Sequence, residues 1–424
     1  MDLLQPVRGT ADLLPENKAR YNHVVSVALD MARRAGFQDM ATPVFEFTQV
    51  FSRPLGEFSD VVAKETYSFD DRGGTRLTLR PEGTASAMRA AISNGLTQSL
   101  PLRWFYSGPM FRYERPQKGR MRQFHQFGCE LIGPASPLAD AEVICLGATI
   151  LSELNILPHT VLHLNSLGDQ ESRLVYRQAL IDYLEQYRSS LSEDSQRRLD
   201  RNPLRILDSK SEADQAILAE APRLPEYLST EAKSHFDKVS ACLNKADIAF
   251  KLDPLLVRGL DYYSHTAFEF ITDALGSQGT VLGGGRYDGL SETLGGPPLP
   301  AVGFAAGIER LALLVGDVAS AAPDIGLLVA NAEAEAEAFG LAASIRHGGV
   351  SCVMLLSGNM GKKMKAANRL GCVFVIIAGS DEFSRGAVSV RCMANGEQSE
   401  VQIFALASWL SERLDKTAQK GHKG

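Results

Sequence analysis

Cysteine is scarce in this sequence, and so are long hydrophobic runs. The six cysteines are widely scattered, with no C-x-x-C pair and no histidine at the spacing of a zinc site. This pattern argues against a disulfide framework and favours reduced, buried thiols. No segment approaches the roughly 18 consecutive apolar residues that a membrane span needs. The N-terminus lacks a basic stretch followed by an apolar one, so we expect no secretory signal and a cytoplasmic location.

The usual nucleotide-binding loops are also missing. The stretch "VLGGGRYDGL" has three consecutive glycines but matches neither G-x-x-x-x-G-K-[ST] nor G-x-G-x-x-G. The stretch "SGNMGKKMK" fails the first pattern because position 356 is Leu356, and it is more typical of a helix start with a basic face. A nucleotide, if one is bound, must therefore be held by another kind of site.

The composition is that of a globular protein, with 45% hydrophobic and 22% charged residues. A chain of 424 residues exceeds one ordinary hydrophobic core and predicts two or three domains. The formal net charge of -6 argues neither for nor against nucleic acid, because docking depends on the local distribution of charge.

Hydrophobic periodicity divides the chain into regions of different character. A mixture of helices and period-2 strands predicts an α+β domain with an antiparallel sheet, interrupted by a charged helical insertion. Buried runs alternating with helices then predict a C-terminal α/β domain with a small mixed or parallel sheet. The expected boundaries are 1–168 and 251–318 for the two parts of the first domain, 169–250 for the insertion, 319–325 for a linker and 326–424 for the C-terminal domain.

The stretch "FRYERPQKGRMRQFHQFGCE", residues 111–130, concentrates basic, acidic and aromatic side chains. We expect two antiparallel strands, 102–113 and 123–132, with the loop between them. Alternation then puts Arg112 and Glu114 on one face, and Phe124, Gln126, Gly128 and Glu130 on one face of the partner strand, where Gly128 would leave an open floor. An arginine can hold a phosphate and a phenylalanine can stack on a base. The alternative, an exposed hairpin with a solvated basic tip, does not explain polar residues alternating within the strands.

Two other stretches have the same character. In "TLRPEGTAS", a carboxylate and a hydroxyl at Glu82 and Thr84 are suited to hold an ammonium group, although Thr84 is also a candidate N-cap for the following helix. In "LLVRGLDYYSHTAFEF", Arg258 and Asp261 lie in an apolar context, where a structural ion pair is the alternative to a functional role.

Together these fragments resemble the histidyl-tRNA synthetases of bacteria, which are class II aminoacyl-tRNA synthetases. "GFQDMATPVFE" resembles the first motif of that class, with Pro43 at the expected dimer interface. "FRYERPQKGRMRQFHQ" resembles the second motif, and "AVGFAAGIERL" resembles the third. "LVRGLDYYSHTAFEF" and "GGGRYDGL" resemble two segments peculiar to the histidine enzymes.

The resemblance implies a role for each matching residue. Arg258 and Arg112 would be catalytic, at the α-phosphate. Histidine would be bound by Glu82, Thr84, Gln126, Glu130, Tyr262 and Tyr263, and ATP by Arg112, Glu114, Arg120, Phe124 and Arg310. Gln117 and Arg122 would contact the acceptor end of tRNA.

The resemblance also implies partners. It implies ATP with Mg²⁺ as substrate, L-histidine and tRNA(His) as further substrates, a homodimer, and a C-terminal domain that binds the anticodon. No metal site built from protein ligands alone and no tightly bound cofactor are expected. The main alternative is the synthetase-like regulatory subunit of ATP phosphoribosyltransferase, which binds histidine but usually lacks the C-terminal domain. A third candidate is an adenylate-forming amide synthetase on the same fold, which would not need that domain.

Overall fold

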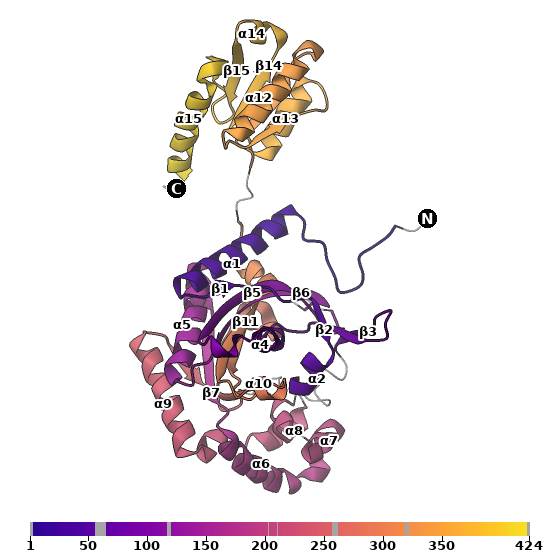
Figure 1. Ribbon diagram of the computed structural model, residues 1–424, viewed down its shortest axis with the longest axis vertical. Helices are drawn as coiled ribbons and strands as arrows, with labels where there is room; N and C mark the ends of the chain where they lie inside the picture. The colour runs from indigo at the N-terminus through magenta and orange to yellow at the C-terminus, as the bar shows by residue number, and fades with distance from the viewer. Residues whose placement is uncertain are drawn as a thin grey trace. The chain divides into compact units, whose positions relative to one another are not determined.

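The computed structural model of the protein divides into two compact units, residues 1–318 and 319–424 (Figure 1). The residues that the structure describes are 3–55, 65–116, 120–201, 203–209, 211–256, 262–318 and 322–421. Each unit has its own sheet and its own hydrophobic core.

An eight-stranded sheet forms the centre of the first unit, with strand order β1-β5-β6-β11-β10-β9-β7-β8. Its strands are β1 (Gln38–Asp39), β5 (Leu102–Phe111), β6 (Gln123–Ile132), β7 (Val161–Ser166), β8 (Phe250–Leu252), β9 (Ser264–Ile271), β10 (Thr280–Arg286) and β11 (Ala301–Gly307). Only the edge pairs β1–β5 and β7–β8 are parallel. This confirms the predicted antiparallel sheet, and β5 pairs with β6 from Leu102↔Ile132 to Phe111↔Gln123.

Helices cover both faces of this sheet, and the side chains of β5 and β6 alternate between them. Phe105, Phe127 and Leu131 belong to the larger core, whereas Trp104 and Ile132 pack on the opposite side. The helices that contribute to the larger core are α1 (Pro15–Arg34), α5 (Pro137–Glu153), α9 (Thr230–Lys245) and α11 (Ile308–Leu314). The helices on the opposite side are α2 (Gln49–Leu55), α4 (Thr84–Ser93) and α10 (Leu290–Thr293). Figure 1 shows the sheet between α1 and α4.

A second, three-stranded sheet adjoins α2, in the order β2-β4-β3. Its strands are β2 (Phe45–Phe47), β3 (Tyr67–Asp70) and β4 (Arg76–Leu79). Glu46 and Thr78 on its inner face are buried, while Phe45, Phe47 and Phe69 on the other face are 50%, 62% and 42% exposed. One face of this small sheet is therefore apolar and open to solvent within a single chain.

Helices dominate the region between β7 and β8. They are α6 (Gln170–Glu185), α7 (Glu193–Arg201), α8 (Glu212–Leu218) and α9. A small core that includes Tyr176, Leu180 and Leu199 holds α6, α7 and their neighbours together. Helix α9 instead places Val239 and Leu243 in the core of the large sheet, so it is packed as part of the main unit.

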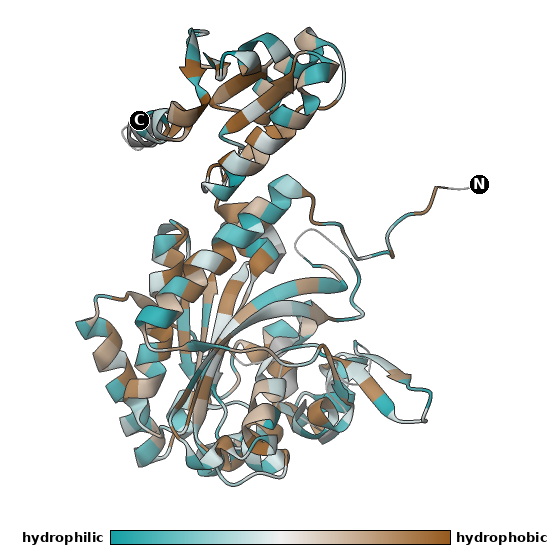
Figure 2. Ribbon diagram, turned by 45° about the horizontal axis from the view of Figure 1, so that its top comes forward, coloured by the Kyte–Doolittle hydropathy of each residue, from teal (hydrophilic) through white to brown (hydrophobic). Residues whose placement is uncertain are grey.

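The C-terminal unit is built on a five-stranded mixed sheet, in the order β13-β12-β14-β15-β16. Its elements are β12 (Ile325–Val329), α12 (Glu335–His347), β13 (Cys352–Met354), α13 (Met360–Leu370), β14 (Phe374–Ala378), α14 (Ser380–Ser384), β15 (Ala387–Cys392), β16 (Gln398–Gln402) and α15 (Leu406–Gly421). β12 is parallel to β13 and β14, whereas β15 and β16 are antiparallel to their neighbours. The central strands are strongly hydrophobic (Figure 2), which confirms the predicted α/β unit. Within the described part of the chain, no helix is both long and apolar enough to span a membrane.

Candidate active site

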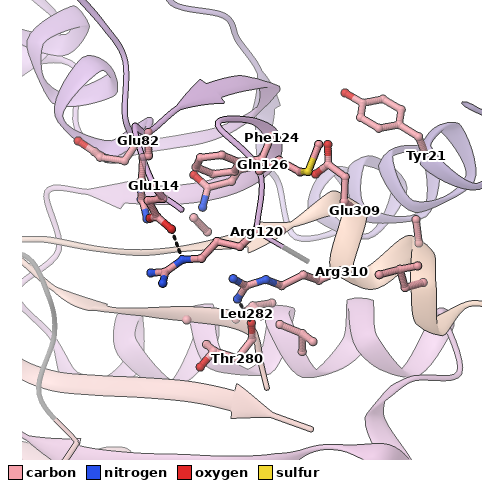
Figure 3. A pocket seen from close by; sticks show the side chains of 18 of the residues that line it. Tyr21, Glu82, Glu114, Arg120, Phe124, Gln126, Thr280, Leu282, Glu309 and Arg310 are labelled. Atoms are coloured by element: carbon pink, nitrogen blue, oxygen red, sulfur yellow. Dashed lines mark hydrogen bonds and ion pairs between the residues drawn. The ribbon is translucent and has the colours of Figure 1, made fainter. Parts of the chain in front are cut away.

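A cavity of about 410 Å³ is lined by the start of α4, the β5–β6 hairpin, β10, α1 and α11 (Figure 3). Most of the residues predicted from the sequence line it: Glu82, Thr84, Arg112, Glu114, Arg120, Phe124, Gln126, Tyr262, Tyr263 and Arg310. Positions separated by up to 228 residues in the sequence thus meet at one site.

One part of the cavity is strongly basic. The guanidinium of Arg112 lies 5.2 Å from the centre of the Phe124 ring, and its Nε donates to the Pro81 carbonyl at 2.9 Å. In Figure 3 the guanidinium groups of Arg120 and Arg310 point into the same space. Burial and the positive charges of Arg120 and Arg112 lower the pKa of Arg310. Arginines that are held close together despite mutual repulsion favour a polyanionic ligand beside an aromatic ring.

The carboxylate of Glu82 is fixed at the start of α4. It accepts hydrogen bonds from the backbone N–H groups of Thr84 at 2.5 Å and Ala85 at 3.0 Å, and burial raises its pKa. Glu82 therefore caps the first turn of the helix. Thr84 does not serve as the N-cap; its hydroxyl donates instead to Glu130 at 2.7 Å. Because Glu82 caps the helix, the Thr84 hydroxyl is available to donate to Glu130.

Glu130 is a fully buried carboxyl group held by hydroxyl groups. Its Oε1 accepts from Thr84 at 2.7 Å and from Tyr106 at 3.0 Å, and its Oε2 accepts from Tyr287 at 2.5 Å. Burial raises the pKa of Glu130 to about 7, although the hydroxyl donors act in the opposite direction. A Cβ at Gly303 would lie 1.8 Å from Oε2, so only glycine leaves room for this carboxylate.

The glycine predicted to form an open floor at position 128 has another role. A Cβ at Gly128 would lie 2.4 Å from the hydroxyl oxygen of Tyr106, so this glycine makes room for the tyrosine ring. The ring in turn brings the Tyr106 hydroxyl to Glu130.

Among the buried polar atoms at the cavity wall that make no hydrogen bond within the described residues are the hydroxyl oxygen of Tyr262 and Oε1 of Gln126. Buried polar groups usually have partners, so such atoms facing a cavity indicate a polar ligand. Both were predicted to bind histidine.

Of the remaining predicted residues, Arg258 and Gln117 lie outside the described residues. Arg122 is described, and its guanidinium stacks 3.9 Å from the centre of the Tyr113 ring. Its contact with tRNA stays a prediction.

Sequence reasoning missed several residues of the site. Tyr106 lies opposite Gly128 in the β5–β6 pair, so the same alternation that selected Glu130 could have found it. Tyr287 belongs to the quoted glycine-rich stretch, but nothing in the sequence indicated that it lies next to Glu130. Glu309 lines the cavity and accepts from both the backbone N–H and the ring of His125, at 2.9 and 2.7 Å. No one-dimensional pattern indicated that bond, because the two residues are 184 positions apart.

Protein-only metal coordination is not evident at this site. Within the described ranges, no group of three or more histidine, cysteine, aspartate or glutamate side chains is arranged to hold a metal ion. Glu114 and Glu269 do contribute carboxylates to the cavity wall.

Comparison with known protein families assigns both units. Residues 9–311 match the family model described as histidyl-tRNA synthetase, and residues 324–413 match the anticodon binding domain. The histidine--tRNA ligase of Rhodospirillum rubrum is 52% identical over 98% of this chain and 100% of its own length. That of Gluconacetobacter diazotrophicus is 51% identical over 97% and 99%.

Solved structures show the same relationship. The apo histidyl-tRNA synthetase of S. aureus is 34% identical, with a TM-score of 0.81 over 96% of this chain and 100% of that one. A Bacillus halodurans chain described as an ATP phosphoribosyltransferase regulatory subunit/histidyl-tRNA synthetase is 23% identical with a TM-score of 0.64, and that likeness shows the fold alone. The near-complete matches at about 50% identity, together with the family models, place the chain: it belongs to the histidyl-tRNA synthetase family.

Proposed function

We propose that this chain joins L-histidine to tRNA(His) in two steps at the cavity of the first unit. A carboxylate oxygen of histidine attacks the α-phosphorus of ATP, and the bond to pyrophosphate breaks. A ribose hydroxyl at the 3′ end of tRNA(His) then attacks the carbonyl carbon of the adenylate, and AMP leaves. The observation that carries the proposal is the cavity itself, which places arginines and a phenylalanine beside buried carboxylates in a member of this family.

The basic part of the cavity is our proposed ATP site. Phe124 offers a ring face to adenine, Arg112 meets the α-phosphate, and Arg120 and Arg310 meet the outer phosphates. Their crowding supports this role, because an incoming triphosphate relieves the repulsion that lowers the pKa of Arg310. Arg258 is our proposed second donor to the α-phosphate, where donors aimed at developing charge stabilise the transition state.

Magnesium is proposed to enter as part of the nucleotide substrate. Carboxylate oxygens are the ligands that this hard cation prefers, and it commonly uses one or two of them together with phosphate oxygens. Glu114 and Glu269 provide such oxygens in the cavity wall.

The acidic part of the cavity is our proposed histidine site. Glu82, Thr84 and Gln126 would hold the α-amino group, and Tyr262, Tyr263 and Glu130 would select the imidazole. The unpartnered oxygens of Tyr262 and Gln126 support this assignment, since a polar amino acid would satisfy them. Glu130 is buried behind Thr84, so the hydroxyl groups that donate to Glu130 must change their hydrogen bonds when the imidazole binds.

A homodimer is proposed from the exposed face of the three-stranded sheet. Cross-strand register aligns Phe47, Leu77 and Phe69 on that face. Contiguous exposed apolar surface of this kind marks interaction sites. The first strand of this sheet, β2, begins shortly after Pro43, where the sequence resembles the first motif of the class and its expected dimer interface.

The experiment that tests the proposed function is charging of tRNA(His). Purified protein, ATP, Mg²⁺ and labelled histidine should give acid-precipitable histidyl-tRNA, and a tRNA for another amino acid should not be charged. The chain's own C-terminal unit favours this outcome over a regulatory subunit. Histidine binding without any charging of tRNA(His) would support the regulatory alternative instead.

A further inference from the structure

The N-terminal segment of residues 3–14, here called the strap, precedes α1, has no helix or strand, and contributes little to any core. Leu3, Leu4 and Val7 are 84%, 96% and 70% exposed. Gly9, Thr10 and Leu13 are the residues of the strap that are partly covered. Leu13 lines the cavity, and Gly9 contacts the β5–β6 hairpin. The strap is thus held mainly where it meets the candidate active site.

The contact at Gly9 is specific in its geometry. The Gly9 carbonyl accepts from the backbone N–H of Arg122 at 2.7 Å and from that of Gln123 at 3.4 Å, at the point where the hairpin loop re-enters β6. Gly9 has a φ of 87°, which favours glycine, and a Cβ there would lie 2.7 Å from Cγ of Arg122. Any other residue would both strain the strap and push the arginine side chain away.

Arg122 connects this contact to the cavity. Its guanidinium stacks on the Tyr113 ring and its Nε donates to the Glu114 carbonyl at 3.3 Å. The side chain of Glu114 is buried and forms an ion pair with Arg120, which projects into the cavity (Figure 3). The chain of contacts therefore runs from the strap, through the base of the loop, to a phosphate-binding arginine.

We propose that the strap is a positioning element of the nucleotide site. By holding Arg122 against Tyr113 and Glu114, it fixes the base of the hairpin loop and keeps Arg120 directed at the outer phosphates of ATP. Gly9, Arg122 and Tyr113 are positioning residues, since they act through Glu114 and Arg120. This inference rests on the proposed ATP site and adds the strap to it; histidine binding, on the other side of the cavity, does not depend on the strap.

The test compares two glycines with a similar positive φ. Gly9→Ala introduces strain and displaces Arg122, whereas Gly349→Ala, at a φ of 83° in the C-terminal unit, meets no atom within 4 Å. Both variants are assayed for ATP–pyrophosphate exchange, for histidine binding by calorimetry and for thermal midpoint. We expect Gly9→Ala to lower kcat/KM for ATP by about 10- to 100-fold, the scale of a misplaced positioning group. Histidine affinity should stay within about twofold, and Gly349→Ala should leave exchange unchanged.

A second pair of variants keeps the test decisive if Gly9→Ala folds poorly. Tyr113→Phe retains the ring under Arg122 and should keep the ATP parameters, whereas Tyr113→Ala should lose them in the same way as Gly9→Ala. Equal losses for ATP and histidine, or unchanged ATP kinetics in Gly9→Ala, would overturn the proposal. An inactive unmodified protein would instead refute the proposed function, so the two failures are distinct.

Discussion

Glu130 combines complete burial with a pKa of about 7, which makes it sensitive to pH near neutrality. Because the pKa is above the unfolded value near 4.5, the native state holds a proton that the unfolded chain releases between these two pH values. The contribution of Glu130 to stability is therefore complete below pH 4.5 and falls as pH rises to about 7. Over that window the loss amounts to roughly 3 kcal/mol.

Replacing Glu130 with glutamine should remove this dependence. We expect the thermal midpoint of Glu130→Gln, measured relative to that of the unmodified protein, to rise from pH 5 to pH 8. A glutamine keeps the shape but never ionises, so the desolvation of a charge is absent. Scanning calorimetry at both pH values measures the shift, and a constant difference would contradict the burial of an ionising group at this position.

Arg258 is expected to act on the transition state rather than on the fold. Arg258→Ala should slow adenylate formation by about 100- to 1,000-fold, the usual effect of removing one such donor. Lysine should rescue only partly, since it lacks the planar fork of the guanidinium. Exchange kinetics and thermal midpoints are compared for both variants. If Arg258 only pairs with Asp261 structurally, the alanine variant would instead lose stability and keep its turnover per folded molecule.

Glu309 connects two elements of the site, β6 and α11. It accepts from His125 of β6, and the next residue, Arg310, donates to the Thr280 carbonyl at 2.6 Å. Removing the acceptor leaves a partly buried N–H group without its partner, which costs about 1–3 kcal/mol. The start of α11 should then be less well fixed, and Arg310 with it.

We therefore expect Glu309→Ala to raise KM for ATP about tenfold and to lower the thermal midpoint. Glu335→Ala is the matched control, because Glu335 lies in the first turn of α12 as Glu309 lies in the first turn of α11, but Glu335 is exposed to solvent. Steady-state exchange kinetics provide both parameters. Identical ATP kinetics in the two variants would show that Glu309 does not position Arg310.

The sequence allowed the β5–β6 hairpin to be predicted because period-2 alternation is a local property. It separated the residues facing α4, such as Gln126 and Glu130, from those in the larger core. The contacts of Tyr287 and Glu309 could not be found in this way, because they span 157 and 184 residues and depend on sheet order. The residue roles came from the family resemblance, since alternation places a side chain on a face without naming its ligand.

At the scale of the whole molecule, the exposed face of the three-stranded sheet predicts a homodimer. Replacing Phe47, which is 62% exposed, with glutamate should dissociate it, because a charge in an apolar interface is costly to bury. Sedimentation velocity should show a dimer for the unmodified protein and a monomer for Phe47→Glu. An unmodified protein that sediments as a monomer while it activates histidine would contradict the proposed interface.

The central claim is that the cavity of the first unit activates histidine with ATP. Histidine-dependent exchange of labelled pyrophosphate into ATP tests it most directly, since this assay needs no tRNA and reports the first step alone. We predict exchange with L-histidine, none with the other amino acids, and its loss in Arg112→Ala. Exchange that does not require histidine, or histidine binding without any exchange, would contradict the account.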